Sequence, residues 1–232
     1  MAHQRLPDEV LKEIITPLLE VPNTLFNNVD VVSPFSKVEW PSSSVLLVCT
    51  RWLRIATPAC YGVAVIRSEA QACAFNAALT RNPEFARHIK RFRIEGTYPR
   101  FITPAIIDLL TGVRELCINI GLLATQSPRD IINLVNKLNP KSLVLFNSVD
   151  RKGVNSSQRA IIRTIAGRLP SWNRLVRCLF APFWLRLHDS AICRPTLLQL
   201  NRFGSSLKAN SPAASQAAVR FATFAWSSAF PF

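Results

Sequence analysis

A helical segment followed by a short strand-like segment recurs along the middle of the chain. Three segments have apolar residues at helical spacing, and each begins with a Ser or Thr that suits a helix N-cap: 68–79, 103–113 and 127–139. Each is followed by a short apolar run with strand character: 88–95, 114–120 and 141–147. A repeated unit of this kind predicts a repeat architecture in which neighbouring units stack to bury their apolar sides.

The spacing of these units restricts the fold further. If Ile94, Ile118 and Leu145 are equivalent strand positions, they lie 24 and 27 residues apart, and Val65 precedes Ile94 by 29 residues. Strand-and-helix repeats of the leucine-rich type have periods of about 20–29 residues. Right-handed crossovers would place all the strands in one open parallel sheet, with the helices on one face. The alternative is an ordinary small α/β domain whose spacing is coincidental.

The first residues of the chain predict a different kind of structure. Residues 6–20 have helical spacing, Pro7 suits a first-turn position, and Asp8 and Glu9 oppose the positive end of the helix dipole. Pro17 is expected to end or kink this helix. Its apolar side comprises Leu6, Val10, Leu11, Ile14, Ile15 and Leu18.

A second N-terminal helix is predicted from about Ser44. Its apolar residues share one helical face: Val45, Val48, Cys49, Trp52, Leu53 and Ala56. Pro58 is expected to end the helix at Thr57, because a proline ring disfavours helical geometry at the preceding residue, and a strand follows at 62–66. Residues 22–43, between the two helices, are rich in Pro, Asn and Ser, which is typical of an inserted loop.

The chain therefore divides into three regions. Residues 1–60 form a helical module, and residues 61–179 form the strand-and-helix units, extended by a helix at 157–169 and a strand from Leu175. Residues 180–232 show no sustained helix or strand period and hold a single acidic residue. This texture is typical of an out-of-frame or intron-derived translation, so we expect the basic tail to be poorly ordered.

The positive charge of the chain is unevenly distributed. The net charge is +14, but residues 1–150 hold 16 basic and 13 acidic residues, whereas residues 151–232 hold 12 and one. The basic run of Arg87, Lys90, Arg91 and Arg93 alternates with apolar residues, which favours the solvated face of a half-buried strand. Aromatic and Arg residues mixed in residues 172–188 keep two alternatives open, nucleic-acid binding and attachment to a membrane surface. A steep loss of binding with salt would identify the first.

Motifs for catalysis, metal binding or membrane insertion are missing from the sequence. The six cysteines form no CxxC pair, and no His lies near them at ligand spacing, so we expect no metal, no cofactor and no disulfide. There is no nucleophile elbow and no Gly-rich phosphate loop, so we expect no enzymatic activity. No apolar run approaches the roughly 18 residues of a membrane span. The N-terminus lacks a secretory pattern, and we expect a cytoplasmic or nuclear protein.

Several of these segments carry a family resemblance. The residues LPDEV at 6–10, LLVCTRW at 46–52 and ATP at 56–58, followed by a Tyr-bearing strand, resemble an F-box. More narrowly, residues 6 to about 150 resemble F-box-containing proteins of basidiomycete fungi. In those proteins a Pro/Ser-containing insertion separates the two box helices, and a segment like residues 68–96 leads into irregular leucine-rich repeats.

The resemblance implies a non-catalytic adaptor of an SCF-type cullin-RING ubiquitin ligase. The F-box would dock on the Skp-type adaptor subunit, and the repeats would hold an unknown protein substrate. The implied docking residues are Leu6, Pro7, Val10, Leu11, Ile14, Leu47, Val48, Trp52 and Leu53. For Leu11 and Leu53, burial in the core of the chain is the competing interpretation. A free-standing repeat-type interaction domain without a ligase role remains the alternative function.

Overall fold

The structure is a computed structural model that describes residues 6–30, 32–36, 42–96, 102–121, 127–148 and 155–180. The tail at 180–232 was expected to be poorly ordered. Of these residues, only residue 180 belongs to the described part of the chain. Within the described part, no helix is long and apolar enough to cross a membrane.

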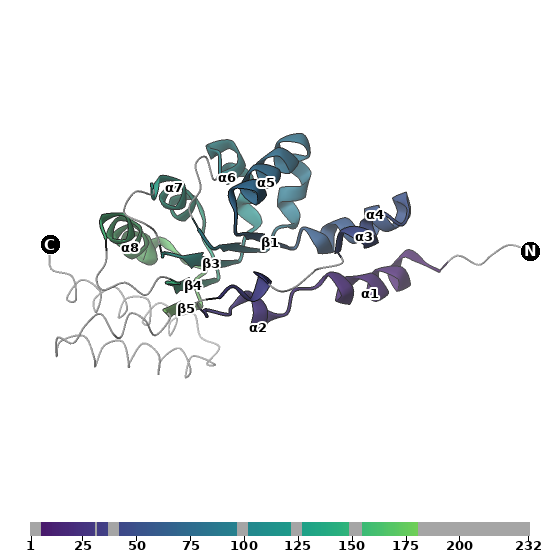
Figure 1. Cartoon of the computed structure of the whole chain (residues 1–232), viewed down its shortest axis with the longest axis horizontal. Coiled ribbons are helices and arrows are strands. Elements are labelled where there is room, and N and C mark those ends of the chain that lie inside the picture. Colours follow the sequence, from purple (N-terminus) through teal and green to yellow (C-terminus); the bar gives the residue numbers. More distant parts are fainter. Residues whose placement is uncertain are drawn as a thin grey trace, which may run out of the picture.

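A five-stranded parallel sheet organises the molecule (Figure 1). The strands lie side by side in chain order: β1 (Val63–Ile66), β2 (Arg91–Ile94), β3 (Glu115–Asn119), β4 (Ser142–Phe146) and β5 (Arg177–Phe180). The predicted single open parallel sheet is therefore confirmed.

The register of the sheet tests the predicted equivalent positions. Ile94, Ile118 and Leu145 occupy one row across the sheet, as predicted. The prediction for Val65 is wrong by one residue, because Val65 pairs with Arg93, and Ile66 pairs with Ile94. Alternation along a strand of four residues does not reveal which of its two faces meets the helices, and in β1 the buried side chain is Ile66.

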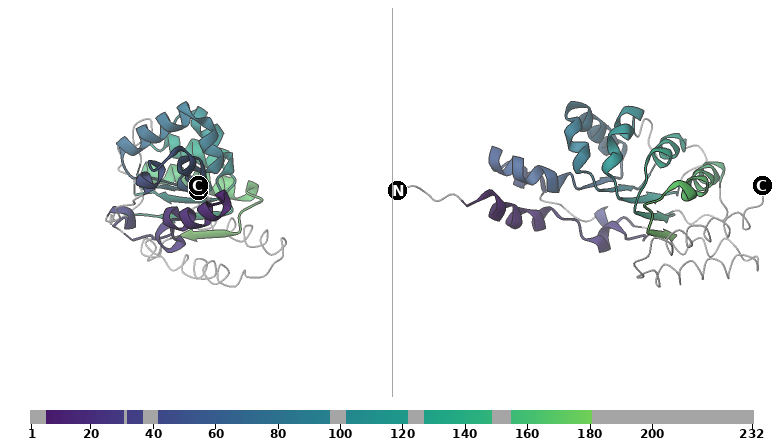
Figure 2. Two further views of the ribbon diagram at one scale, coloured as in Figure 1. Left: turned by 90° about the vertical axis from the view of Figure 1, so that its right-hand side faces the viewer. Right: turned by 180° about the vertical axis from the view of Figure 1, so that it is seen from behind.

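The helices that connect the strands cover one face of the sheet (Figures 1 and 2). These are α5 (Glu69–Arg81), α6 (Pro104–Leu109), α7 (Arg129–Lys137) and α8 (Ser156–Arg168), with the 3-10 segments η2 (Pro83–His88), η3 (Leu110–Gly112) and η4 (Leu169–Ser171). The α5 cap is as predicted, since Ser68 Oγ accepts a hydrogen bond from the Gln71 amide at 3.2 Å. The predicted Ser127 cap of α7 is displaced by one residue to Pro128.

One hydrophobic core lies between the sheet and these helices. Each strand contributes inward-facing residues such as Phe92, Leu116 and Leu143, and each helix contributes a buried row such as Ile131, Leu134 and Val135 of α7. Because a single strand-and-helix unit buries only part of its apolar surface, the continuous core stabilises each unit through its neighbours.

The N-terminal helical region consists of α1 (Asp8–Leu19), α3 (Ser42–Leu46) and α4 (Thr50–Cys60). These helices pack on one another around a small separate core of Leu11, Ile15, Leu19 and Ala56. The single second helix expected from Ser44 is instead two helices, separated at Leu47, Val48 and Cys49. The extended backbone of Cys49, with φ −165° and ψ 168°, makes the break and lets both helices reach α1.

The expected helix end at Thr57 is also wrong. Pro58 lies inside α4, which continues to Cys60, and α1 likewise continues two residues past Pro17. A proline this close to the C-terminal end of a helix removes only one backbone hydrogen bond. In α4 the carbonyl that loses its donor is that of Arg54, an exposed residue. The last turn is closed by bonds from beyond the proline, including Tyr61 N to Thr57 O at 3.0 Å.

The segment between α1 and α3 does not stay with the helices. Residues 21–36, described except for residue 31, contain α2 (Asn23–Phe26) and η1 (Pro34–Ser36) and lie on the face of the sheet opposite to α5–α8 (Figures 1 and 2). We call these residues the strap. The predicted inserted loop therefore packs against the strand-and-helix units and not only between two helices of the N-terminal module.

Candidate partner-binding face

The apolar residues of α1 form two adjacent rows with opposite surroundings. Leu11, Ile15 and Leu19 are buried against α4, whereas Val10, Ile14 and Leu18 are exposed, as is Leu6, two residues before the helix begins. The contrast is sharpest between neighbours, since Ile14 is 50% exposed and Ile15 is 0% exposed. Helical residues four apart lie one above the other, so Val10, Ile14 and Leu18 form a continuous apolar ridge.

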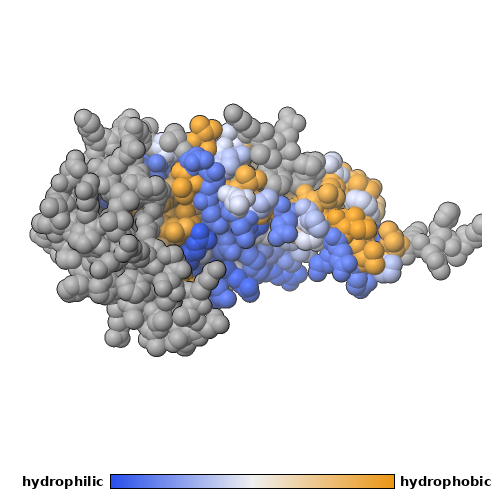
Figure 3. All heavy atoms as spheres, turned by 90° about the horizontal axis from the view of Figure 1, so that it is seen from below, coloured by the Kyte–Doolittle hydropathy of each residue, from blue (hydrophilic) through white to orange (hydrophobic). Residues whose placement is uncertain are grey.

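A second group of exposed apolar residues surrounds the turn between α3 and α4. Leu47 is 83% exposed, and Val48 and Leu53 are also exposed. The extended Cys49 interrupts helical packing, so the side chains before it project from the turn. In Figure 3 apolar side chains gather over the end of the molecule that α1 forms. We call these exposed residues together the docking face: Leu6, Pro7, Val10, Ile14, Leu18, Leu47, Val48 and Leu53.

Charged side chains hold the N-terminal end of α1 against α4. Arg51 Nε donates to Asp8 Oδ1 at 2.7 Å, Arg54 pairs with the other carboxylate oxygen of Asp8, and Arg51 also donates to the Leu6 carbonyl. The hydrogen bonds from Arg51 and then from Arg54 lower the pKa of Asp8 below its ordinary value of 3.8. This clamp fixes Leu6 relative to α4, and so it positions one end of the docking face.

The nine docking residues that the resemblance implies differ in their exposure. Seven are exposed, and Trp52 is half-buried against the small α1–α4 core. Leu11 requires a correction, because at 4% exposure its side chain belongs to that core and offers no contact surface. Leu18 was not implied, although its position four residues after Ile14 could have placed it in the exposed row.

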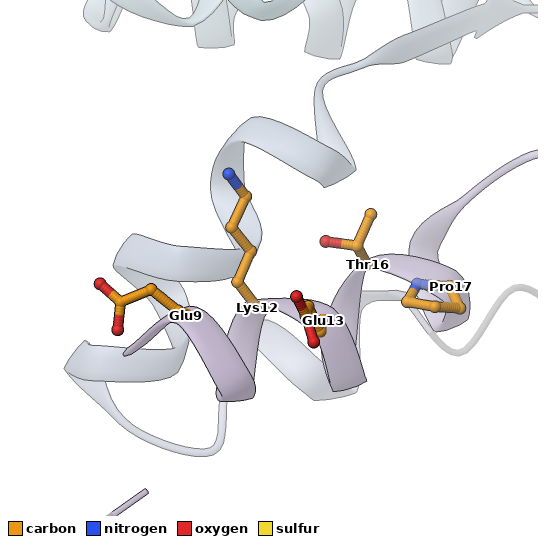
Figure 4. A pocket seen from close by; sticks show the side chains of 5 residues that line it. All are labelled: Glu9, Lys12, Glu13, Thr16 and Pro17. Carbon is orange, nitrogen blue, oxygen red and sulfur yellow. The ribbon is translucent and has the colours of Figure 1, made fainter. Parts of the chain in front are cut away.

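The polar side of α1 carries a shallow hollow, shown in Figure 4. It is lined by Glu9, Lys12, Glu13, Thr16 and Pro17, all from this one helix. In Figure 4 the Lys12 ammonium points away from the carboxylate of Glu9, so the lining side chains do not converge on one point. A single helix cannot enclose a ligand, and the hollow therefore marks the polar border of the docking face.

The basic run before and in β2 has a structural role that the sequence did not reveal. The expectation of a solvated face is wrong for Arg93, which is 0% exposed, and Arg91 is half-buried. Both guanidinium groups donate hydrogen bonds to the strap, which covers this face of the sheet. Arg87 is exposed and forms an ion pair with Glu84.

The described residues form no metal-binding site beside the docking face. Among the described residues, no group of three or more His, Cys, Asp or Glu side chains could hold a metal ion. Burial raises the pKa of the Cys117 thiol to about 12, so this thiol stays protonated at neutral pH.

Comparison of the chain with family models, with curated proteins and with solved structures found no match.

Proposed function

We propose that the chain is a non-catalytic substrate-recognition adaptor of an SCF-type ubiquitin ligase, with an F-box-like N-terminal module. It docks on the Skp-type adaptor subunit through the docking face, and it holds a protein substrate through the strand-and-helix units. The observation that carries the proposal is the exposed apolar row of α1 together with the exposed residues of the α3–α4 turn, in two helices that Arg51 joins through Asp8 and the Leu6 carbonyl.

An exposed surface of this composition favours a protein partner. A contiguous apolar patch on a globular protein indicates an interaction site, whereas single exposed apolar residues need no explanation. Here the exposed residues are continuous along α1, and the half-buried Trp52 adds an aromatic anchor of the kind that dominates binding energies. The border of Glu9, Lys12 and Glu13 supplies the polar rim that such interfaces have.

The second half of the proposal assigns substrate binding to the stacked units. Arrays of strand-and-helix units present extended surfaces, on which neighbouring units contribute side chains to one partner. In this chain the five strands advance in sequence order, so successive units contribute adjacent positions. Substrate identity would depend on exposed side chains of these units.

The direct test is binding of the full-length chain to a fungal Skp-type adaptor, measured as a dissociation constant. Truncation of Ile14 and Leu47 together, as Ile14→Ala/Leu47→Ala, should weaken binding about 30-fold or more if these side chains act as hot spots. The thermal midpoint should stay close to that of the wild type, because both side chains are exposed.

A matched control is available in Val176, which is 65% exposed and lies beside β5, in a part of the molecule other than α1. Val176→Ala should bind the adaptor as the wild type does. If the folded wild-type chain does not bind the adaptor, the proposal is wrong, and a free-standing repeat-type interaction domain becomes the better description. Nucleic-acid binding through the basic run of β2 is disfavoured, because Arg91 and Arg93 donate hydrogen bonds to the strap.

A further inference from the structure

The strap binds the sheet mainly through two arginines of β2. Arg93 Nη1 donates to the carbonyl oxygens of Phe26 at 2.6 Å and Asn28 at 2.7 Å. Arg91 donates to the Val21 carbonyl at 2.6 Å and to Asn23 Oδ1 at 2.8 Å. Residues two apart in a strand point to the same face, so both arginines reach the same segment.

The strap contributes two phenylalanine anchors to this contact. Phe26 is buried and packs in a cluster with Cys117, Val144 and Phe146 of β3 and β4. Phe35 is also buried, and the Arg93 guanidinium lies 5.6 Å from its ring centre and 4.8 Å from that of Phe146. Aromatic anchors beside arginines that bind main-chain oxygens are the features by which proteins bind short peptides.

The contact nevertheless leaves buried polar atoms unpaired. The hydrogen bonds of the strap's own backbone are local, such as Phe26 N to Pro22 O at 3.0 Å. Two buried polar atoms at this contact have no hydrogen-bond partner in the described part of the chain: Asn27 Oδ1 and Arg93 Nη2. An interface with unsatisfied buried polar atoms is weaker than a fully paired one.

The strap-covered face is also the side of the sheet away from the helices, where the strands of several units lie side by side. An external peptide can bind Arg91 and Arg93 on this face only when the strap leaves them.

We propose that this face of the sheet is a peptide-binding surface and that the strap is its resident, displaceable occupant. The external partner is a peptide segment with the chemistry of the strap. It has an aromatic side chain for the Phe26 site, oxygen acceptors for Arg91 three and five residues before that side chain, and carbonyl acceptors for Arg93 at the aromatic residue and two residues after it. An acceptor that also reaches Arg93 Nη2 gives such a partner one hydrogen bond that the strap does not make. This proposal rests on the proposed function in one respect: it assigns partner binding to the strand-and-helix units.

The test uses a fluorescent peptide of residues 21–36 and the full-length chain, with no ligase subunit present. In the wild type the tethered strap competes with the peptide, whereas in Phe26→Ala the tethered strap has lost an anchor. The Phe26→Ala chain should therefore bind the peptide at least about tenfold more tightly than the wild-type chain does, as measured by anisotropy. The same peptide carrying Phe26→Ala should bind at least about tenfold more weakly than the unchanged peptide does.

Three further variants address folding and the location of the binding site. Asn23 is exposed and accepts one hydrogen bond from Arg91, so Asn23→Ala should keep the fold and bind the peptide a few times more tightly than the wild type. Thr24→Ala, an exposed change in the same segment, should bind as the wild type does. Adding Arg91→Gln to the Phe26→Ala chain should abolish peptide binding, because Arg91 donates to two acceptors of the strap.

Hydrogen exchange of the wild-type chain gives an independent measurement. If the strap can be displaced, it opens locally, and the amides of Phe26 and Asn27 should exchange faster than the amides of β3. Equal peptide binding by the wild-type and Phe26→Ala chains, or strap amides that exchange only when β3 unfolds, would show a permanent core segment and overturn the proposal. Failure of the chain to bind a Skp-type adaptor would leave these results unaffected, because the assay contains none.

Discussion

The N-terminal helical module and the strand-and-helix array use the same kind of apolar spacing with different results. In the array, the apolar residues of strands and helices meet in one continuous core. In the module, α1 buries Leu11, Ile15 and Leu19 but leaves Val10, Ile14 and Leu18 in solvent, and Leu6, just before the helix, is also exposed. The apolar side chains of the array pack against its own helices on one face of the sheet and against Phe26 of the strap on the other. The exposed row of α1 has no such partner among the described residues.

The two regions also differ in one charged contact. The ion pair of Arg93 with Glu95 in the array is almost entirely buried, and the distance from Arg93 Nε to Glu95 Oε1 is 2.6 Å. The ion pairs of the module, from Arg51 and Arg54 to Asp8, lie at the surface, as do the other ion pairs of the array, Arg87 with Glu84 and Lys137 with Asp108. Among the described residues, the array therefore buries one ion pair and the module buries none.

The largest effect should follow from breaking the buried ion pair of the array. Glu95→Ala leaves the buried guanidinium of Arg93 without its carboxylate and removes the acceptor of Ser33 Oγ, so the free energy of unfolding should fall by about 3–5 kcal/mol. Chemical denaturation measures the change. Glu84→Ala, which removes the exposed pair with Arg87, is the control and should cost less than about 1 kcal/mol. Equal effects would mean that the pair of Arg93 with Glu95 is not sealed from water.

The two rows of α1 offer the closest matched pair. Ile15→Ala creates a cavity in the small core and should lower the free energy of unfolding of the module by roughly 2–5 kcal/mol. Ile14→Ala, at the adjacent residue, should change it by less than about 0.5 kcal/mol. Thermal unfolding followed by circular dichroism compares them. A large destabilisation by Ile14→Ala would place this side chain in a core and remove it from the docking face.

Removing a helix cap should lower the free energy of unfolding by a smaller amount, and by more in the array than in the module. In the array, Asn155 Oδ1 accepts from the Gln158 amide at 2.9 Å and the Gln158 side chain bonds back to the Asn155 amide, so Asn155→Ala should cost about 1 kcal/mol. In the module, Cys49 caps α4 without a side-chain bond, and Cys49→Ala should cost less than about 0.5 kcal/mol. Denaturant titration gives both values. A costly Cys49→Ala would contradict this difference between the regions.

The smallest effect concerns pH and the clamp at Asp8. Because the folded-state pKa of Asp8 lies below the ordinary 3.8, the ionised carboxylate stabilises the module at pH values above 3.8. That contribution is lost as the pH falls through the folded-state pKa, since protonation removes the charge that Arg51 and Arg54 bind. The wild type should melt slightly above Asp8→Asn at neutral pH, and the difference should disappear in strong acid. A difference that persists there would exclude the carboxylate as its source.

The parts of the fold that follow from local repetition could be predicted from the sequence. The parallel order of the strands and the alignment of Ile94, Ile118 and Leu145 follow from a unit whose helix and strand recur at similar spacing. Ser68 was predicted as a cap because its hydroxyl immediately precedes a helical pattern. In each case the residues concerned lie within one unit or between adjacent units.

The strap and the division of α1 could not be predicted, for two physical reasons. The contact of Phe26 with Arg93 joins segments 67 residues apart, and the Pro- and Asn-rich strap has no period that would indicate what it contacts. Helical spacing predicted the apolar side of α1, but this side is wider than the surface that α4 covers. Spacing alone therefore did not show that Leu11 is buried and Ile14 is exposed. Pro58 was interpreted from its local preference, which a position near the end of α4 overrides.

The burial of Phe26 against β3 and β4 has a consequence for the order of events during synthesis. Translation proceeds from the N-terminus, so Phe26 leaves the ribosome before the strands that cover it. About 120 residues separate it from Phe146, which at roughly 5–20 residues per second take roughly 6–24 s to synthesise. During this interval the nascent chain carries an apolar segment that has no site to occupy. A chaperone that binds such segments would encounter the strap before the sheet exists.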